Sequence, residues 1–315
     1  MKPLFLISIF SMLLVGGCCM PCPGPAPYTG PTESMVRVVA EINANNSKLP
    51  TLAAHHFYEA DVVDEKKQNH HVSGDGVLLY MTPNSMRLTA DNTVVGTVFE
   101  IGSNPKSYWL KLGPQTGDTM YWGNWADYDA LDPQNAQIPI RPDMVLDVLG
   151  ITMINPNFNT TPAPTMRFDP YADAYVFVWS GKAPTQWVAL REVWYDRTTK
   201  LPKLILLYDM NGRVALRAEF ADQSKIVNGR PTFDIKNYRQ VPLPGLSKDQ
   251  WPWMPENYHL YFPASGSKLT FTIERAALTE PDQDVVRPER RSFRMPNPAE
   301  PGVSKVYQIG QPAGN

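Results

Sequence analysis

The sequence predicts a mainly β protein of the α+β class, built on one large, curved, antiparallel sheet. Three observations predict it. β-prone runs follow one another about every ten residues, turn-forming pairs separate them, and several runs alternate apolar with polar side chains. Alternation gives a sheet one dry face and one wet face, so the dry face must be covered. Two or three helices are expected to cover this concave face.

The first residues have the layout of a secretory signal peptide. Lys2 precedes an apolar stretch over residues 4–15, which is shorter than the ~20 residues of a spanning helix. The run Val15-Gly16-Gly17-Cys18 resembles the lipobox of bacterial lipoproteins, in which the cysteine thiol is acylated after cleavage. We therefore predict a signal peptide over residues 1–17 and a lipid on Cys18. Ordinary secretion with a cut near Gly17 is the alternative.

Composition limits the function of the chain beyond this anchor. Charged residues make up 19% of the chain and hydrophobic residues 43%, as in a folded globule. The net charge of -2 provides no broad basic field, so no nucleic-acid partner is predicted. All three cysteines, Cys18, Cys19 and Cys22, come before the body of the protein, which therefore has no disulfide. The C-x-x-C spacing of Cys19 and Cys22 lies among prolines, where neither redox nor metal chemistry is expected.

Residues 18–31 are rich in proline and glycine and predict a semi-extended tether. The first helix should follow at once, because Met35, Val38, Val39 and Ile42 recur at helical spacing. The sequence Asn45-Asn46-Ser47 then ends it. A single domain is expected over residues 32–280, and a charged, proline-rich and loose tail over residues 281–315.

Strands and one more helix fill the predicted domain. Strands are expected over residues 52–63, 72–82, 86–90, 97–101, 108–112, 119–123, 165–168, 175–180, 187–196, 203–209, 213–221, 232–238, 258–262 and 268–274. Ser73-Gly74-Asp75-Gly76 indicates a bulge, and Asn211-Gly212 indicates a tight hairpin turn. Pro142 and Gly150 bound the second helix, at its first turn and at its end.

The order of these parts resembles the LolA/LolB-like lipoprotein-localisation fold. The lipobox, the first helix ending in Asn45-Asn46, the strand Ser107-Tyr108-Trp109-Leu110-Lys111, the step Tyr121-Trp122-Gly123 and the 142–150 helix carry the resemblance over residues 31–280. It implies an open, incomplete β-barrel with helices as a lid over an apolar cavity. Members of that family carry or receive acylated proteins between bacterial membranes. Membrane-acceptor members have a protruding apolar loop after the third strand, where this chain has only Val94 and Val95.

The dry face supplies candidates for a ligand cavity. Alternation places apolar side chains together in the second half of the chain, and the resemblance places the first half around the same cavity. The predicted lining consists of Phe99, Ile101, Tyr108, Leu110, Leu206, Leu216 and Phe271. The same residues would equally fill a closed core.

No catalytic pattern stands out, and neither an enzyme nor a cofactor is predicted. G-x-S-x-G is absent from the sequence, and the pairs His55-His56 and His70-His71 would point to opposite faces of a strand, so no metal site is expected. The acidic run over residues 127–132 lacks the glycine of a calcium loop. The loop Trp251-Pro252-Trp253-Met254-Pro255 is expected to anchor the core, with an exposed contact as the alternative.

The sequence therefore predicts a monomeric lipoprotein of the bacterial envelope. It would bind acyl chains or a lipidated or hydrophobic partner in an apolar cavity. The residue after Cys18 is not aspartate, which resembles sorting to the outer membrane, facing the periplasm. Two alternatives stay open: a structural or scaffold lipoprotein with a filled core and no ligand, and an envelope hydrolase of glycan or lipid.

Overall fold

The computed structural model describes residues 26–63, 67–94, 96–114, 118–128, 146–160, 162–182, 186–209, 211–220, 226–227, 230–231, 233–277, 290–298 and 303–309. The predicted signal peptide, Cys18 and the first part of the tether lie outside these residues. Among the described residues, no helix has both the length and the apolar character needed to cross a membrane.

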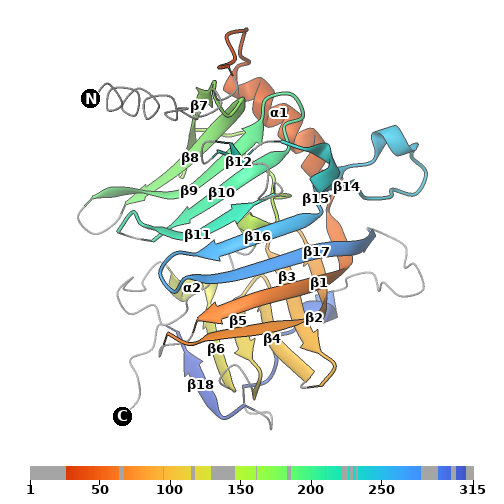
Figure 1. The fold of residues 1–315 in the computed structure, drawn as a ribbon, viewed down its shortest axis with the longest axis vertical. Helices are drawn as coiled ribbons and strands as arrows, with labels where there is room; N and C mark the ends of the chain where they lie inside the picture. Colours follow the sequence, from red (N-terminus) through yellow and green to blue (C-terminus); the bar gives the residue numbers. More distant parts are fainter. Residues whose placement is uncertain are drawn as a thin grey trace, which may run out of the picture.

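Fourteen strands form one sheet (Figure 1). Their bounds are β1 Thr51–Val63, β2 Asn69–Met81, β3 Ser85–Asn92, β4 Gly96–Ser103, β5 Ser107–Leu112, β6 Thr119–Asn124, β7 Pro164–Asp169, β8 Ala174–Lys182, β9 Trp187–Asp196, β10 Pro202–Tyr208, β11 Val214–Glu219, β16 Asn257–Phe262, β17 Ser267–Ala277 and β18 Lys305–Gln308. Two short pairs lie apart from it, β12 Ile226–Val227 with β13 Arg230–Pro231 and β14 Tyr238–Gln240 with β15 Trp253–Pro255.

The helices of the described residues are few and short. They are α1 Met35–Asn46 and α2 Trp125–Tyr128, with 3-10 turns η5 Ile235–Asn237, η6 Lys248–Gln250 and η7 Arg290–Phe293. Residues 146–148 are also helical and end the predicted 142–150 helix, whose start lies outside the described residues. The predicted mainly β class is confirmed.

The chain enters the sheet at its middle, with β1. Strands β1 to β6 run outward as a meander to one side, the chain then crosses to β7 at the opposite edge, and β7 to β11, β16 and β17 return. Strand β17 finally pairs antiparallel with β1, so the two halves join there. The outermost strands are β7 and β18, which do not pair with each other, and the sheet is therefore open. Every pairing in it is antiparallel except that of β18 with β6.

Helix α1 and the segment 146–154 cover one face of the sheet. Val38, Val39 and Ile42 of α1 are buried, as helical spacing predicted. Asn43 joins the helix to the segment, since its Nδ2 donates to the Ile154 carbonyl at 2.7 Å and its Oδ1 accepts from the Ile154 amide at 2.9 Å. Leu149 and other apolar residues of the segment belong to the core cluster.

Local signals predicted one hairpin turn correctly and one β-bulge wrongly. The Asn211-Gly212 turn joins β10 to β11, with Gly212 at φ +75°. The bulge predicted at residues 73–76 is absent, because β2 pairs with β1 in unbroken register. Gly74 and Gly76 instead lie opposite Tyr58 and His56, and a Cβ on Gly76 would stand 2.0 Å from the Thr89 carbonyl oxygen. These glycines leave room for two rings; the irregular pairing lies between His55 and His56, against β17.

One further expectation was wrong. Residues 232–238 do not form a long strand; their described part is a 3-10 turn, η5, that leads into the three residues of β14. The described parts of the tail are packed against the body. Phe293 is buried and its carbonyl accepts from Asn104 Nδ2 at 3.1 Å, while Tyr307 of β18 stacks on Tyr121 at 5.3 Å.

Candidate functional site

The covered face of the sheet is where the predicted ligand site would lie. Five of the seven predicted lining residues belong to one continuous core cluster, namely Ile101, Tyr108, Leu110, Leu216 and Phe271. Phe99 is partly buried and packs against this cluster. These six residues come from β4, β5, β11 and β17, so the fold brings both halves of the chain to a common core.

Leu206 does not join them. On β10 the core side chains are Ile205 and Leu207, and Leu206 lies between them on the opposite face, across from Arg217 and Glu192 of the neighbouring strands. The prediction chose the wrong phase of the alternation because Leu204, Ile205, Leu206 and Leu207 are all apolar. Burial in this run therefore follows from strand pairing and not from hydropathy.

The core is filled by the chain's own side chains. Large residues of the cluster, such as Tyr80, Phe177 and Phe220, are fully buried. Two surface hollows of about 500 Å³ each are present among the described residues, and neither is lined by any of the seven predicted residues. One lies at the β7–β8 turn, and the other on β11, β16 and β17 beside Arg217, His259 and Lys268.

Two polar side chains interrupt this apolar core. His56 Nε2 donates to the Thr89 carbonyl at 3.0 Å, which leaves its buried Nδ1 without a partner. The neighbouring Tyr58 hydroxyl is buried and has no partner either. Rings of Phe271 and Phe99 contact the two side chains edge-on. Burial lowers the pKa of His56 to about 4, so the ring is neutral near pH 7.

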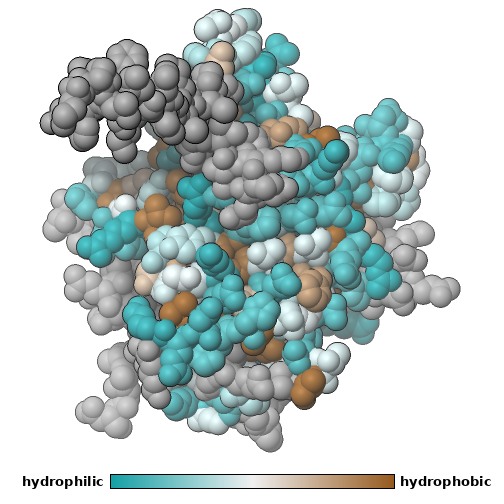
Figure 2. Space-filling view, viewed as in Figure 1, coloured by the Kyte–Doolittle hydropathy of each residue, from teal (hydrophilic) through white to brown (hydrophobic). Residues whose placement is uncertain are grey.

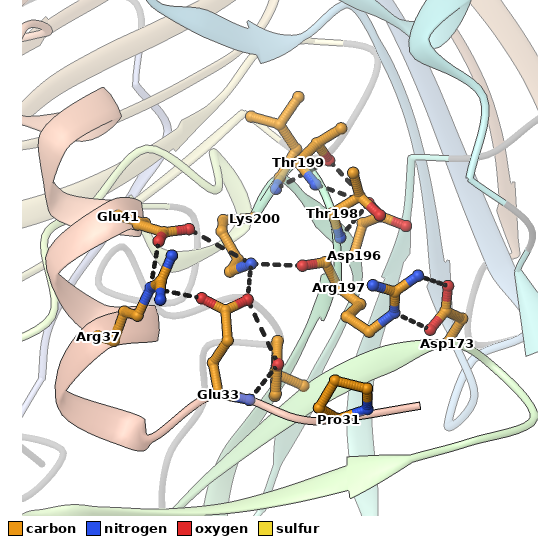
Figure 3. Close-up of polar contacts among 12 residues, drawn as sticks. Pro31, Glu33, Arg37, Glu41, Asp173, Asp196, Arg197, Thr198, Thr199 and Lys200 are labelled. Atoms are coloured by element: carbon orange, nitrogen blue, oxygen red, sulfur yellow. Dashed lines mark hydrogen bonds and ion pairs between the residues drawn. The ribbon is translucent and has the colours of Figure 1, made fainter. Parts of the chain in front are cut away.

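A polar cluster fixes the start of α1 at one end of the sheet (Figure 3). Lys200, at φ +60° in the β9–β10 turn, extends its Nζ to Glu33 Oε1 at 2.6 Å and to Glu41 Oε2 at 3.3 Å. Arg37 reaches the same two carboxylates at 3.0 and 3.1 Å. Glu33 also donates its backbone N–H to the Tyr175 hydroxyl at 2.8 Å. We call Glu33, Arg37, Glu41 and Lys200 the entry clasp.

Neither the entry clasp nor the buried His56–Tyr58 pair was predicted from the sequence. Glu33 and Lys200 are 167 positions apart in the chain, and Glu33 and Tyr175 are 142 apart. No local pattern relates residues so distant, so a single sequence carries no signal for them. His56 stood out in the sequence only as one of an adjacent pair, and the glycines opposite it predicted a bulge.

Face-on, the central strands are mainly hydrophilic (Figure 2). Hydrophobic side chains appear over them as separate spots. No three His, Cys, Asp or Glu side chains of the described residues are grouped so that they could hold a metal ion. Trp253 is partly buried against the core and Met254 fully buried, as expected of a loop that anchors it. The acidic run 127–132 lies outside the residues whose side chains are described.

Comparison with known proteins gives structural likenesses only. No protein-family model matches the sequence, and no curated protein is significantly similar to it. Among solved structures, the chain is similar to a LolA superfamily protein from Nitrosomonas europaea, at 10% identity and a TM-score of 0.42, over 80% of this chain and 96% of that one. It is also similar to a Vibrio parahaemolyticus domain described as a putative outer membrane lipoprotein-sorting protein. The identity is 12% and the TM-score 0.42, over 79% of this chain and 94% of that one.

A DUF1329 family protein from Desulfovibrio piger is also similar, at 9% identity and a TM-score of 0.39, over 84% of this chain and all of that one. These structures agree with the LolA-like resemblance found in the sequence. These three TM-scores are below 0.5 and the identities are 9–12%, so the likeness concerns the fold alone.

Proposed function

We propose that this chain is a lipid-anchored protein of the bacterial cell envelope that acts through its surface, as a scaffold for another envelope component. The observation that carries the proposal is the filled core. Ile101, Tyr108, Leu110, Leu216 and Phe271 are buried against other side chains of the same cluster. An acyl chain would have to displace them, at a cost of several kcal/mol for each large side chain lost from the core.

The anchor is the part of this proposal that the sequence supports most directly. Acylation of Cys18 after cleavage behind Gly17 would supply the two or more chains that stable anchoring requires. Cys19 follows in place of aspartate, which favours the outer membrane. The lipobox motif and this neighbour are the support for the localisation.

Metabolic labelling with palmitate in a bacterial host tests the anchor. We expect label on the wild-type chain and on Cys22→Ser, and none on Cys18→Ser, because only the first cysteine follows the small pair Gly16-Gly17. Cys22→Ser is the matched control for the loss of a thiol. Equal labelling of Cys18→Ser would overturn the proposed anchor.

The second candidate is the predicted acyl-chain binding, and one observation favours it. The Nδ1 of His56 and the hydroxyl of Tyr58 have no hydrogen-bond partner and lie among aromatic rings. They would offer hydrogen bonds to the polar group of a ligand whose apolar part packs on those rings. Entry would need the cover of α1 and residues 146–154 to move away from the sheet.

Titration of the delipidated protein with a fluorescent fatty acid separates the two candidates. The scaffold proposal expects no saturable binding by the folded wild type. Saturable binding that Phe99→Trp weakens and Leu206→Asp leaves unchanged would favour the acyl-binding candidate instead. Phe99 borders the core and Leu206 lies on the other face of the sheet, so the two variants form a matched pair.

A further inference from the structure

The tether does not run freely up to the body. Tyr28, well before the first helix, already lies against the sheet, where its N–H donates to the Pro170 carbonyl at 2.8 Å. Its ring contacts the edge of Phe168, with the centroids 5.7 Å apart. The Arg197 guanidinium covers that ring at 3.9 Å from its centroid, and Asp173 holds Arg197 through bonds of 2.6 and 3.2 Å.

The entry segment, residues 26–34, is thus attached at two points. Tyr28 is held by the β7–β8 turn and by Arg197, and Glu33 is held by Lys200 and Tyr175. Around the first attachment, Ala26 to Gly30 line one of the two hollows together with Pro170, Tyr171 and Asp173. Two separate attachments fix the direction in which the chain leaves the body, whereas one would act as a swivel.

This attachment limits how far the body can lie from Cys18. Eight peptide steps join Cys18 to Ala26, and a fully extended chain of that length spans about 28 Å. The β7–β8 turn is therefore bound to stay within about that distance of a lipid on Cys18, less than the length of a typical domain. The tether cannot let the body turn over.

We propose that the end of the molecule carrying the β7–β8 turn, the β9–β10 turn and the start of α1 faces the membrane, with Tyr171 at the lipid headgroups. The inference rests on the proposed acylation of Cys18. Tyr171 stands in the β7–β8 turn with 56% of its surface exposed. Tyrosine is enriched at membrane interfaces, where its ring meets apolar carbon and its hydroxyl meets water. Val36, on the first turn of α1, is exposed on the same end.

The opposite orientation would follow from the resemblance to membrane-acceptor lipoproteins. In that arrangement the β3–β4 turn, with Val94 exposed to 87%, would approach the bilayer. In Figure 1, β7 and α1 lie at one end of the long axis, while β4, β5 and β6 lie toward the other. The short tether allows the first end, and not the second, to reach the membrane that holds the lipid.

Charge plays little part in this contact. The cations at the membrane-facing end are each paired with a carboxylate, through the contacts among Arg37, Lys200, Glu33 and Glu41 and through the pair of Arg197 with Asp173. Such pairs leave no net field for anionic lipids at physiological salt. The orientation should therefore not depend on ionic strength.

Site-specific photocrosslinking tests the orientation. Two variants are expressed in a bacterial host, Tyr171→p-benzoylphenylalanine and Val94→p-benzoylphenylalanine. Purified membranes are irradiated, and lipid adducts of the protein are measured by mass spectrometry. We expect about tenfold more adduct at 171 than at 94, at low and at high salt, because the probe must reach the interface to react. Equal adduct at the two positions, or more at 94, would overturn the inference.

Two further arms keep the result decisive. Absence of lipid mass on Cys18 would count against the proposed function alone. In that case Cys18 is coupled to a maleimide lipid in vesicles, in a chain with Cys19→Ser and Cys22→Ser so that no other thiol reacts, and the orientation is measured there. Arg197→Gln with Lys200→Gln should reduce the preference for 171, because each attachment loses its contact with a cation. If that variant unfolds, Tyr28→Ala removes the ring contacts of the first attachment and changes no residue of the sheet. An unchanged preference for 171 in these variants would contradict the role of the two attachments in setting the orientation.

Discussion

His56 and Tyr58 place polar atoms in an apolar core, and glycines make this possible. Their rings lie over Gly76 and Gly74 of the neighbouring strand, so that His56 reaches the Thr89 carbonyl on the strand beyond. The arrangement depends on burial that favours the neutral ring, since the cost of burying a protonated His56 outweighs the attraction of Asp75 and Asp91. Protonation of His56 at low pH should therefore destabilise the folded state.

Lowering the pH should destabilise the fold through protonation of His56. The folded-state pKa is about 4 and the unfolded value is 6.5, so the neutral ring stabilises the fold fully above pH 6.5. As pH falls from 6.5 to 4, about 3 kcal/mol of unfolding free energy should be lost, because only the unfolded state takes up the proton over that range. Denaturant unfolding across this window, for wild type and His56→Phe, measures the difference.

His71 provides the control for that measurement. Its side chain is 62% exposed, so His71→Phe should retain the decline seen in the wild type. His56→Phe should show a shallower decline. Parallel curves for wild type and His56→Phe would mean that another group is responsible.

At the scale of elements, the cover of the core is held by amide side chains. Asn43 binds Ile154 through both its donor and its acceptor, Asn46 Nδ2 donates to the Thr152 carbonyl at 2.9 Å, and Asn45 binds both backbone groups of Trp253. Three separate roles for asparagine at the end of α1 explain why the sequence Asn45-Asn46 stands there. In the sequence it predicted only where the helix ends.

Asn43→Ala should loosen the cover. It removes two part-buried hydrogen bonds and leaves the Ile154 amide and carbonyl unpaired, at a cost of about 1–3 kcal/mol. Arg37→Ala is the control on the same helix: its ion pairs belong to a side chain that is 70% exposed, and such surface pairs contribute little to stability. Midpoints of urea unfolding compare the two, and an Asn43→Ala as mild as Arg37→Ala would contradict this role.

Strands and hairpins were the predictable elements, because period-two alternation and turn residues are local. The bounds of β1 and β16 and the turn at Gly212 match the expectation closely. The face of β10 was not predictable, since Leu204 to Leu207 fit either phase. The seven cavity candidates shared this weakness: apolar residues that line a cavity and those that fill a core have the same pattern.

At the scale of the whole molecule, the pairing of β1 with β17 was the feature that no local signal could give. Residues such as Tyr58 and Phe271 meet across more than two thirds of the chain. The packing of β18 on β6 is another long-range contact, and it converts part of a tail expected to be loose into a sheet edge. The loss of chain entropy on closing such long loops is offset only when the full sheet forms.

Hydrogen exchange should follow that architecture. Amides of β1 and β17 lie between paired strands at the centre of the sheet, so they should open only with the whole fold, whereas β7 and β18 lie at its edges and should exchange with opening free energies lower by about 2 kcal/mol or more. Exchange followed by mass spectrometry on peptides from these strands measures the order. If residues 32–280 form the single domain that the sequence predicts, β2 to β6 and β8 to β11 should lose protection together with β1 and β17. Exchange of either half in advance of β1 and β17 would instead show two units joined at this pairing.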